Sequence, residues 1–522
     1  MASGREPLRW FGRVALMVAA IISGGLAAVG YWLGDTYIPR LSDHAGYYLV
    51  QAGQGQPQAQ PANKPRRTVV VVVDGLRADY ARSMTSAKRL ERAGTCLQMP
   101  VGELTVSRPV YAVLSTGLEA DRTGARNNDE TSPLVAESVW ENARKAGLTV
   151  HGASDVPYWQ QLFPVGFDRY VIEETRDEVV FEQVELADIT LIHASYPDAA
   201  GHDHGASSDQ YRDAVARTDR ELMGLLERLD LSEDMVVLTA DHGHVDRGGH
   251  GGPARSISVV WTCFAGPTIS SRDPPSRMDA RSFAPALSVL WGVAFPANMR
   301  AGDDDLDTIF ELVDSSALGQ GYVEARKQQI EKMRAANALA VADWSDSDSS
   351  SWSELYRRER NRQLVRMGLT VAILLLLLLL LLVVGYREPL AIVLHLVWMA
   401  GLLAASASVY VLLRGSFDFT SINLRAVFVS SSTIAIMITL LVASCVHLFI
   451  GRSGKQLAFD LLVLTAVVVA AGLGHRIVYG VPLGFPLPGR YELFFPFMGA
   501  AWAISLGFSA TVISLVAAIR TR

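Results

Sequence analysis

Short apolar runs alternate with helix-like segments between about residue 67 and residue 340. This alternation predicts an α/β domain with a largely parallel sheet, in which helices such as the segment 210–229 cover the strands. The four clearest strand-length runs, three of which lead into polar or acidic residues, are TVVVVVDG (68–75), DITLIHASY (188–196), DMVVLTADHG (234–243) and SISVVWTCFAG (256–266). Because ligands collect at the carboxyl ends of such strands, we expect a site at that edge of the sheet.

Longer uncharged stretches flank this region and predict membrane-spanning helices. Val14–Gly34 is long enough to cross a hydrocarbon core of about 30 Å, and three arginines precede it. We interpret it as an uncleaved anchor rather than a signal peptide, because no convincing small-x-small cleavage site follows it. Five further apolar stretches lie near 367–385, 390–413, 426–450, 457–479 and 493–519. The α/β domain is then expected on the extracytoplasmic side, facing the periplasm, the outer face or a lumen.

These features predict six segments along the chain. They are a cytoplasmic N-terminus (1–13), a transmembrane anchor (14–34), a linker (35–66), the extracytoplasmic domain (67–340), a second linker (341–366) and a five-span transmembrane domain (367–519). The first linker is rich in Gln, Pro and Gly, and the second contains the polar run DWSDSDSSSWS. The net charge of −6 and the lack of a basic patch interleaved with aromatic residues argue against nucleic acid as a partner.

Three cysteines, Cys96, Cys263 and Cys445, are too few and too far apart for a disulfide framework or a cysteine zinc site. Two interpretations remain for the first pair. We expect free cysteines packed in or near buried strands, where cysteine behaves as a small apolar residue, and keep a Cys96–Cys263 bridge as the alternative.

The α/β domain also contains an ordered set of metal-ligand residue types. They are Asp74, Asp198, His202, Asp241, His242 and His250. Asp74 and the Asp241–His242 pair each follow a buried strand, so their side chains can converge, and such convergence is costly without a cation. Oxygen and nitrogen ligands in this mixture suit zinc, with manganese possible and calcium or magnesium disfavoured. The set can divide around two metals about 4 Å apart, which suits in-line displacement at phosphorus.

Ser107 is the predicted nucleophile, with its hydroxyl facing both metals. Free serine is a weak nucleophile, and the chain has no Gly-x-Ser-x-Gly elbow that would indicate a Ser-His-Asp mechanism. Pro109 and an apolar helical run follow Ser107. We therefore expect Ser107 at a helix N-terminus, where amides and a partial positive charge suit an anionic phosphoryl group.

Five motifs in order resemble those of the alkaline-phosphatase superfamily. They are DGLRADY (74–80), TVSRPVYAVLSTG (105–117), PDAAGHDHG (197–205), ADHGHVDRGGHGG (240–252) and FAPALSVLWGVAFPAN (283–298). Within the superfamily they are most similar to GPI ethanolamine phosphate transferases and next to nucleotide pyrophosphatase/phosphodiesterases. The resemblance covers about residues 67–300 and implies an alkaline-phosphatase-like sheet sandwiched by helices.

The resemblance also implies two zinc ions and a transiently phosphorylated serine. One ligand set would be Asp74, Ser107, Asp241 and His242, and the other Asp198, His202 and His250. It assigns Asn128 to the phosphoryl oxygens, with Asn127 as the alternative. The spacing Asp-x-x-Gly-His favours His202 over His204, and we expect His204 and His244 to lie behind the ligands or on the surface. Tyr111 stands where sulfatases carry an arginine, which argues against a sulfatase.

The combined features predict a membrane-anchored, zinc-dependent transferase. It would move phosphoethanolamine, or a similar phospho-headgroup, from a phospholipid donor such as phosphatidylethanolamine to a hydroxyl on a lipid or glycan. The first alternative is a phosphodiesterase or nucleotide pyrophosphatase that uses the same site with water as the acceptor. The second is an inactive membrane binding or assembly subunit, which would normally lack a ligand or the nucleophile; none is missing here.

Overall fold

A computed structural model gives the structure of the protein. It describes residues 5–40, 57, 59–102, 104–118, 123–125, 128, 132–173, 177–182, 184–252, 254–270, 275–297, 299, 306–346, 368, 389–414, 425–449, 461–462, 464–465, 468–469 and 490–520. The described residues fall into two compact units. One, here called the α/β unit, lies within 44–347, and the other contains the N-terminal helix and the C-terminal helices.

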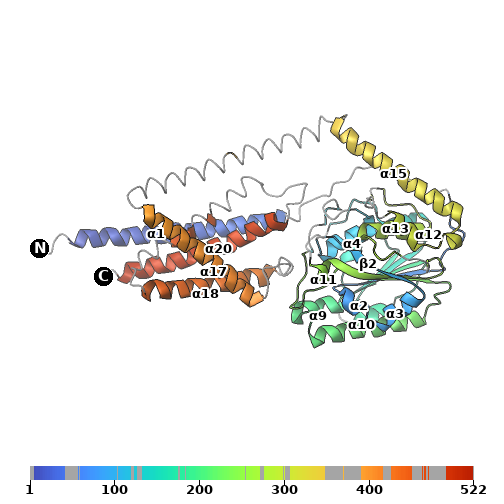
Figure 1. Ribbon diagram of the computed structural model, residues 1–522, viewed down its shortest axis with the longest axis horizontal. Coiled ribbons are helices and arrows are strands. Elements are labelled where there is room, and N and C mark those ends of the chain that lie inside the picture. The colour runs from blue at the N-terminus through green and yellow to red at the C-terminus, as the bar shows by residue number, and fades with distance from the viewer. Residues whose placement is uncertain are drawn as a thin grey trace. The chain divides into compact units, whose positions relative to one another are not determined.

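A seven-stranded mixed sheet forms the middle layer of the α/β unit (Figure 1), in the order β2-β7-β6-β1-β5-β3-β4. The strands are β1 (Thr68–Val73), β2 (Gly94–Pro100), β3 (Val150–Ser154), β4 (Arg169–Ile172), β5 (Ile189–Ala194), β6 (Met235–Thr239) and β7 (Val259–Ala265). Neighbours from β6 to β4 pair in parallel, whereas β7 is antiparallel to both β6 and β2. The predicted α/β class and its four predicted strands, present as β1, β5, β6 and β7, are confirmed.

Strand β1 lies in the centre of this sheet because its sequence suits burial on both faces. Five successive valines follow Thr68, and all six residues of β1 are buried. Parallel strands β5 and β6 flank β1 along almost its whole length. β-branched side chains pack well on such a pleated surface. The acidic residue after β1, Asp74, is therefore delivered to the middle of one sheet edge.

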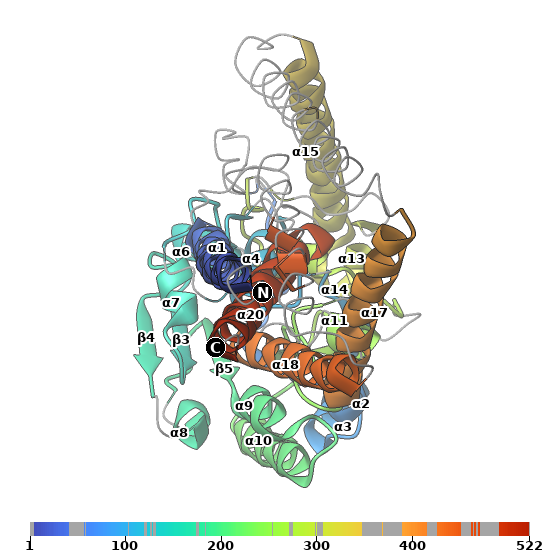
Figure 2. The same ribbon diagram turned by 90° about the vertical axis from the view of Figure 1, so that its left-hand side faces the viewer.

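Helices cover both faces of the sheet (Figures 1 and 2). One face carries α2 (Ala78–Ala81), α3 (Thr85–Arg92), α9 (Tyr196–His204) and α10 (Asp209–Glu227), and the other carries α4 (Ser107–Thr116), α6 (Val139–Lys145), α7 (Tyr158–Leu162) and α12 (Phe283–Trp291). The remaining elements are α8 (Asp177–Glu182), α11 (Arg255–Ser258), η1 (Ala280–Ser282), α13 (Leu306–Leu312), α14 (Ser315–Leu318) and α15 (Gln320–Asp346). The helix predicted at 210–229 is α10, which buries Tyr211, Val215 and Leu222.

The described residues of the second unit form four long helices: α1 (Arg5–Arg40), α17 (Pro389–Arg414), α18 (Arg425–Phe449) and α20 (Arg490–Arg520). Among the described residues, one stretch, Val14–Trp32, is long and apolar enough to cross a membrane. The described apolar stretches in the other three helices are shorter: Ala400–Arg414, Ser431–Ala443 and Trp502–Val516. The five predicted C-terminal spans are therefore not shown, and those at 367–385 and 457–479 lie largely outside the described residues.

Helices α1 and α20 pack along one another through small residues. A side-chain carbon added at Gly30 would lie 2.5 Å from the Ala503 methyl carbon, so glycine permits this approach. The Thr511 hydroxyl donates to the Ala20 carbonyl at 3.3 Å. Close packing of small residues is a typical way for apolar helices to associate.

A disulfide joins Cys96 to Cys263, so the expectation of two free cysteines is wrong. The two residues are direct partners in the antiparallel pairing of β2 with β7. The register places their Cα atoms 4.0 Å apart, although 167 residues separate them in sequence. Only the strand register reveals this proximity, which sequence spacing conceals.

We expect Cys96→Ser to lower the free energy of unfolding of the α/β unit by about 2–4 kcal/mol, because the disulfide closes a long loop. The measurement is the unfolding transition of the detergent-solubilised chain, with Cys445→Ser as the matched control. Non-reducing peptide mapping should recover a Cys96–Cys263 cross-linked peptide. Two alkylated thiols at these positions in the untreated protein would contradict the assignment.

Candidate active site

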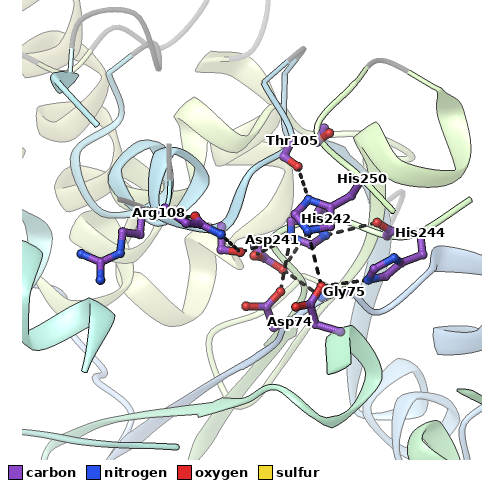
Figure 3. A network of polar contacts seen from close by, with 12 residues as sticks. Asp74, Gly75, Thr105, Arg108, Asp241, His242, His244 and His250 are labelled. Carbon is purple, nitrogen blue, oxygen red and sulfur yellow. Dashed lines mark hydrogen bonds and ion pairs between the residues drawn. The ribbon is translucent and has the colours of Figure 1, made fainter. Parts of the chain in front are cut away.

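The edge of the sheet where β1, β5 and β6 end brings together residues from distant parts of the chain (Figure 3). Asp74 directly follows β1, and Asp241 and His242 follow β6. Helix α9, which follows β5, carries Asp198 and His202. Figure 3 shows His250 beside His242, and Ser107 begins α4 as expected. This convergence at the carboxyl ends of parallel strands is the usual place for a site in an open α/β sheet.

The first cluster consists of Asp74, Asp241 and His242, all buried. His242 Nε2 lies 3.3 Å from Asp74 Oδ1 and 3.3 Å from Asp241 Oδ2. The backbone amides of Gly75 and His242 donate to the other oxygen of Asp241, at 3.2 and 2.9 Å. Each carboxylate is thus anchored through one oxygen and directs the second oxygen toward the same imidazole.

The two inward oxygens of this cluster are its most informative feature. Asp74 Oδ1 and Asp241 Oδ2 are buried and accept no hydrogen bond from any described residue. His242 Nδ1 lies 3.1 Å from the Gly243 carbonyl, so this nitrogen carries the proton and Nε2 presents a lone pair. Two carboxylate oxygens that accept no hydrogen bond from described residues thus lie beside an imidazole lone pair, which is an arrangement that a bound cation satisfies.

Ser107 lies beside this cluster, with its Oγ 3.3 Å from His242 Nε2. The Asn128 side-chain amide donates to the same Oγ at 3.3 Å, and its carbonyl accepts from the Arg108 backbone amide at 3.0 Å. The N-terminus of α4 therefore orients Asn128, which in turn presents an N–H group to the serine. The Arg108 guanidinium points away from the cluster (Figure 3) and stacks over the Tyr158 ring, 4.0 Å from its centroid. Asn127 lies outside the described residues.

The second cluster contains Asp198, His202, His244 and His250. His202 Nε2 and His250 Nε2 lie 3.1 Å apart and 3.4 and 3.6 Å from the Asp198 carboxylate. His250 Nδ1 contacts the Thr105 carbonyl at 2.7 Å, which leaves its Nε2 lone pair facing the cluster. The side chains of Asp198 and His202 are about one fifth exposed, at 19% and 20%, so solvent reaches this cluster and not the first.

His244 differs from the other histidines in this cluster in its hydrogen bonding. Its Nδ1 accepts a hydrogen bond from the Gly249 amide at 3.1 Å, so the proton lies on Nε2, which donates to Asp198 Oδ1 at 2.8 Å. His244 is therefore a hydrogen-bond donor that holds Asp198, and it is fully buried. His204, the alternative to His202, is exposed at the end of α9. The sequence signal for His244 is its position two residues after the Asp241–His242 pair.

The two clusters adjoin each other. The His242 and His250 rings stack with their centroids 3.7 Å apart and their planes 16° from parallel. Gly75 has φ +69°, and a side-chain carbon there would lie 2.7 Å from Asp198 Cα. A residue with a side chain is excluded at this point by both the backbone conformation and the close approach. Glycine thus allows the loop after β1 to contact α9.

Burial dominates the electrostatics of both clusters. Burial raises the pKa of Asp241 well above its usual value, and the negative charges of Asp74 and Asp198 raise it further. Burial also lowers the pKa of His242 and, together with the neighbouring His242, that of His250. Neutral imidazoles with inward lone pairs suit metal binding, and a cation would favour the ionised form of the carboxylates.

The pKa of Asp198 differs from that of Asp241 because two histidine side chains donate hydrogen bonds to Asp198. Burial alone would raise its pKa, but the hydrogen bonds from His202 and His244 lower it well below the usual value. The same carboxylate acts on His202: burial would lower the pKa of that imidazole, yet the hydrogen bond and charge of Asp198 raise it. The second cluster is therefore partly charge-balanced by its own residues, whereas the first is not.

A buried polar network extends from Asp74 away from both clusters, and sequence reasoning missed it. The Tyr111 hydroxyl donates to Asp74 Oδ2 at 2.5 Å and lies 2.8 Å from His193 Nε2. His193 Nδ1 lies 2.8 Å from Ser154 Oγ and 3.6 Å from Asp155. Burial opposes a charge on His193, but the hydrogen bonds to Asp155 and Asp74 raise its pKa to about 10. Burial and then the charge of Asp74 raise the pKa of Tyr111, so the phenol stays a donor.

One protein-family model matches the part of the α/β unit that carries these residues. Residues 68–249 match the model of the family described as Type I phosphodiesterase / nucleotide pyrophosphatase. The chain is therefore similar to this family over about a third of its length. The matched range ends within the loop that carries His244 and His250, so it includes Asp74, Ser107, Asp198 and Asp241. Phosphodiesterases of this kind are metal-dependent, and the clusters described above are candidates for that metal.

Curated relatives of this chain include proteins named as transferases. The GPI ethanolamine phosphate transferase 3 catalytic subunit of Homo sapiens is 22% identical over 360 residues, which cover 59% of this chain and 32% of that protein. GPI ethanolamine phosphate transferase 2 of Yarrowia lipolytica is 26% identical over 282 residues, which cover 45% of this chain and 32% of that protein. The chain thus spans about a third of the length of these relatives. The expected resemblance to these transferases and to the phosphodiesterases is confirmed.

Solved structures similar to part of this chain include murine ectonucleotide pyrophosphatase/phosphodiesterase 5. The match has a TM-score of 0.41 and 14% identity, and it covers 48% of this chain and 100% of that chain.

We expect Gly201→Ala to weaken divalent-metal affinity by about tenfold or more, because loss of a supporting hydrogen bond has this effect on metal sites. The added methyl carbon would lie 2.5 Å from the His244 ring and would displace it from Asp198. The measurement is competition with a chromophoric chelator. Gly224→Ala on α10 is the matched control, since nothing lies within 4 Å of the added carbon there. Equal affinities of the two variants would contradict the role of His244.

Proposed function

We propose that the chain is a membrane-anchored, zinc-dependent phosphoethanolamine transferase. The donor is a phospholipid such as phosphatidylethanolamine, and the acceptor is a hydroxyl on a lipid or glycan. The proposal rests above all on the Ser107 hydroxyl, which lies 3.3 Å from both His242 Nε2 and Asn128 Nδ2. Two buried carboxylate oxygens that accept no hydrogen bond from described residues belong to the same cluster. A hydroxyl in such a place suits a nucleophile activated beside a cation.

The residues present fit two divalent cations. The first set would be Asp74, Ser107, Asp241 and His242, and the second Asp198, His202 and His250. Oxygen and imidazole donors in this mixture suit zinc, with manganese as the other candidate. Bound in these sets, the cations supply positive charge that favours the ionised serine and the departing oxygen.

The reaction then follows from the positions of the side chains. Ser107 Oγ attacks the donor phosphorus, a bond forms between them, and the bond from phosphorus to the diglyceride oxygen breaks. The serine proton ends on the departing diglyceride hydroxyl. Asn128 Nδ2, already directed at Oγ, donates to a phosphoryl oxygen as negative charge develops there. The acceptor hydroxyl next attacks the phosphorus, the bond to Oγ breaks, and the acceptor proton returns to Ser107.

The proposed membrane attachment supports a lipid donor. The Val14–Trp32 stretch of α1 can cross a bilayer, and the proposed topology adds five C-terminal spans between residues 367 and 519. The segment boundaries predicted from the sequence are kept in this proposal, with the extracytoplasmic alkaline-phosphatase-like catalytic domain at 67–340. The Cys96–Cys263 disulfide supports an extracytoplasmic position for this domain, because disulfides persist in oxidising compartments.

The alternative function is hydrolysis of a phosphodiester or a nucleotide pyrophosphate. The family match over residues 68–249 favours it, because that family takes its description from such hydrolases. The first half-reaction would be the same, and water would replace the acceptor hydroxyl in the second. The site geometry is equally compatible with both acceptors.

Incubation of the detergent-solubilised protein with phosphatidylethanolamine should add one phosphoethanolamine to the chain, as measured by intact mass spectrometry. We expect the adduct to map to Ser107 and to be absent in Ser107→Ala. Asn128→Ala retains the nucleophile, so its adduct should still form, but roughly 100-fold more slowly, as for the loss of one oxyanion donor.

Absence of the adduct, together with release of products from nucleotide diesters, would favour the hydrolase. If the zinc-loaded wild-type protein neither forms the adduct nor hydrolyses nucleotide diesters, both the transferase and the hydrolase proposals are contradicted.

A further inference from the structure

We propose that Tyr111, clamped by Trp159 and His193, is a positioning residue that fixes the Asp74 carboxylate for cation binding. This inference rests on the function proposed above, because it concerns the same site. Tyr111 is not itself a candidate ligand, since its hydroxyl contacts the carboxylate oxygen that faces away from the cluster. The role assigned to it is control of the orientation of a ligand.

The two oxygens of Asp74 have different surroundings. Oδ2 accepts the Tyr111 hydroxyl at 2.5 Å. Oδ1 lies 3.3 Å from His242 Nε2 and accepts no hydrogen bond from the described residues. The two oxygens are equivalent, so a half-turn of the carboxylate restores the same arrangement, but any smaller rotation would lose the hydrogen bond to Tyr111. One donor on the outer oxygen therefore keeps the inner oxygen directed at the place where Asp241 and His242 also converge.

The phenol itself has little freedom. The Tyr111 side chain is fully buried on α4, and its ring stacks on Trp159 with centroids 4.5 Å apart and planes 21° from parallel. His193 Nε2 lies 2.8 Å from the hydroxyl oxygen and fixes its other side. A donor held by ring packing and by a second hydrogen bond costs little further entropy when the ligand binds.

The network continues to the helix that carries the second cluster. His193 Nδ1 contacts Ser154 Oγ at 2.8 Å, and Ser154 donates to Asp155 at 3.3 Å. Asp155 also accepts a hydrogen bond from Ser195, the residue that precedes the first turn of α9. Helix α9 bears Asp198, so the same buried polar chain supports a ligand in each cluster. The stronger and more direct contact is with Asp74, and the effect of Tyr111 should be concentrated there.

Tyr111→Phe tests this role, because it removes only the hydroxyl. Tyr322→Phe is the matched control: Tyr322 is also buried in the same unit and donates to the Val289 carbonyl at 2.6 Å, but it contacts no residue of either cluster. Zn²⁺ affinity is measured by chelator competition in the full chain, and the Co²⁺-loaded proteins are compared by visible absorption. We expect Tyr111→Phe to weaken one Zn²⁺ binding step by about 10- to 100-fold and to shift the Co²⁺ bands. Tyr322→Phe should change neither.

The outcomes separate this inference from the proposed function. Wild-type affinity and an unchanged Co²⁺ spectrum in Tyr111→Phe would overturn the role of Tyr111 while leaving the metal site intact. Equal weakening of both binding steps would also overturn it, because that pattern indicates general loosening. If Tyr111→Phe does not fold, His193→Gln is judged by the same criteria, with a smaller expected loss. No Zn²⁺ uptake by the wild-type protein would refute the proposed function and, with it, this inference.

Discussion

Burial of negative charge at the carboxyl edge of the sheet is the constraint on which the site depends. Asp74 and Asp241 are 3% and 0% exposed, and both direct an oxygen at the same imidazole nitrogen. Ionised carboxylates in such surroundings are unfavourable unless they are paired with positive charge. The surrounding structure does not relieve this cost through hydrogen bonds to the inward oxygens. Hydrogen bonds instead hold the outward oxygens in place. A divalent cation beside the inward oxygens would balance the negative charge of the two carboxylates.

The fold supplies this arrangement through the order of its strands. β1 is central, and β5 and β6 flank it, so three chain segments distant in sequence end side by side. These segments carry candidate metal ligands and also groups that orient those ligands or the candidate nucleophile. Gly75 donates its amide to Asp241 and also permits the close approach of Asp198. The α4 N-terminus fixes Asn128 beside Ser107. Positioning of the candidate nucleophile and ligands is thus distributed over strands, loops and helix ends.

Much of the fold and the approximate location of the site could be predicted from the sequence. Strands such as β1 are apolar throughout, and the acidic residue after each one is visible as a pattern. The short edge strand β4 and strand β3, with His151 and Gly152 inside it, lack that uniform apolar character. Disulfide formation between Cys96 and Cys263 depended on strand register, which is a tertiary property. The sequence predicts a supporting or surface position for His244, and only the tautomer implied by its hydrogen bonds shows that it donates to Asp198.

Helices α1 and α20 pack against one another, and the whole α/β unit lies between them in sequence. During synthesis, α1 leaves the ribosome long before α20 exists, and in that interval it lacks the partner it contacts in the final structure. The α/β unit and helices α17 and α18 are therefore synthesised before α20 can pack against α1. The contact of Gly30 with Ala503 therefore forms only after α20 has been synthesised.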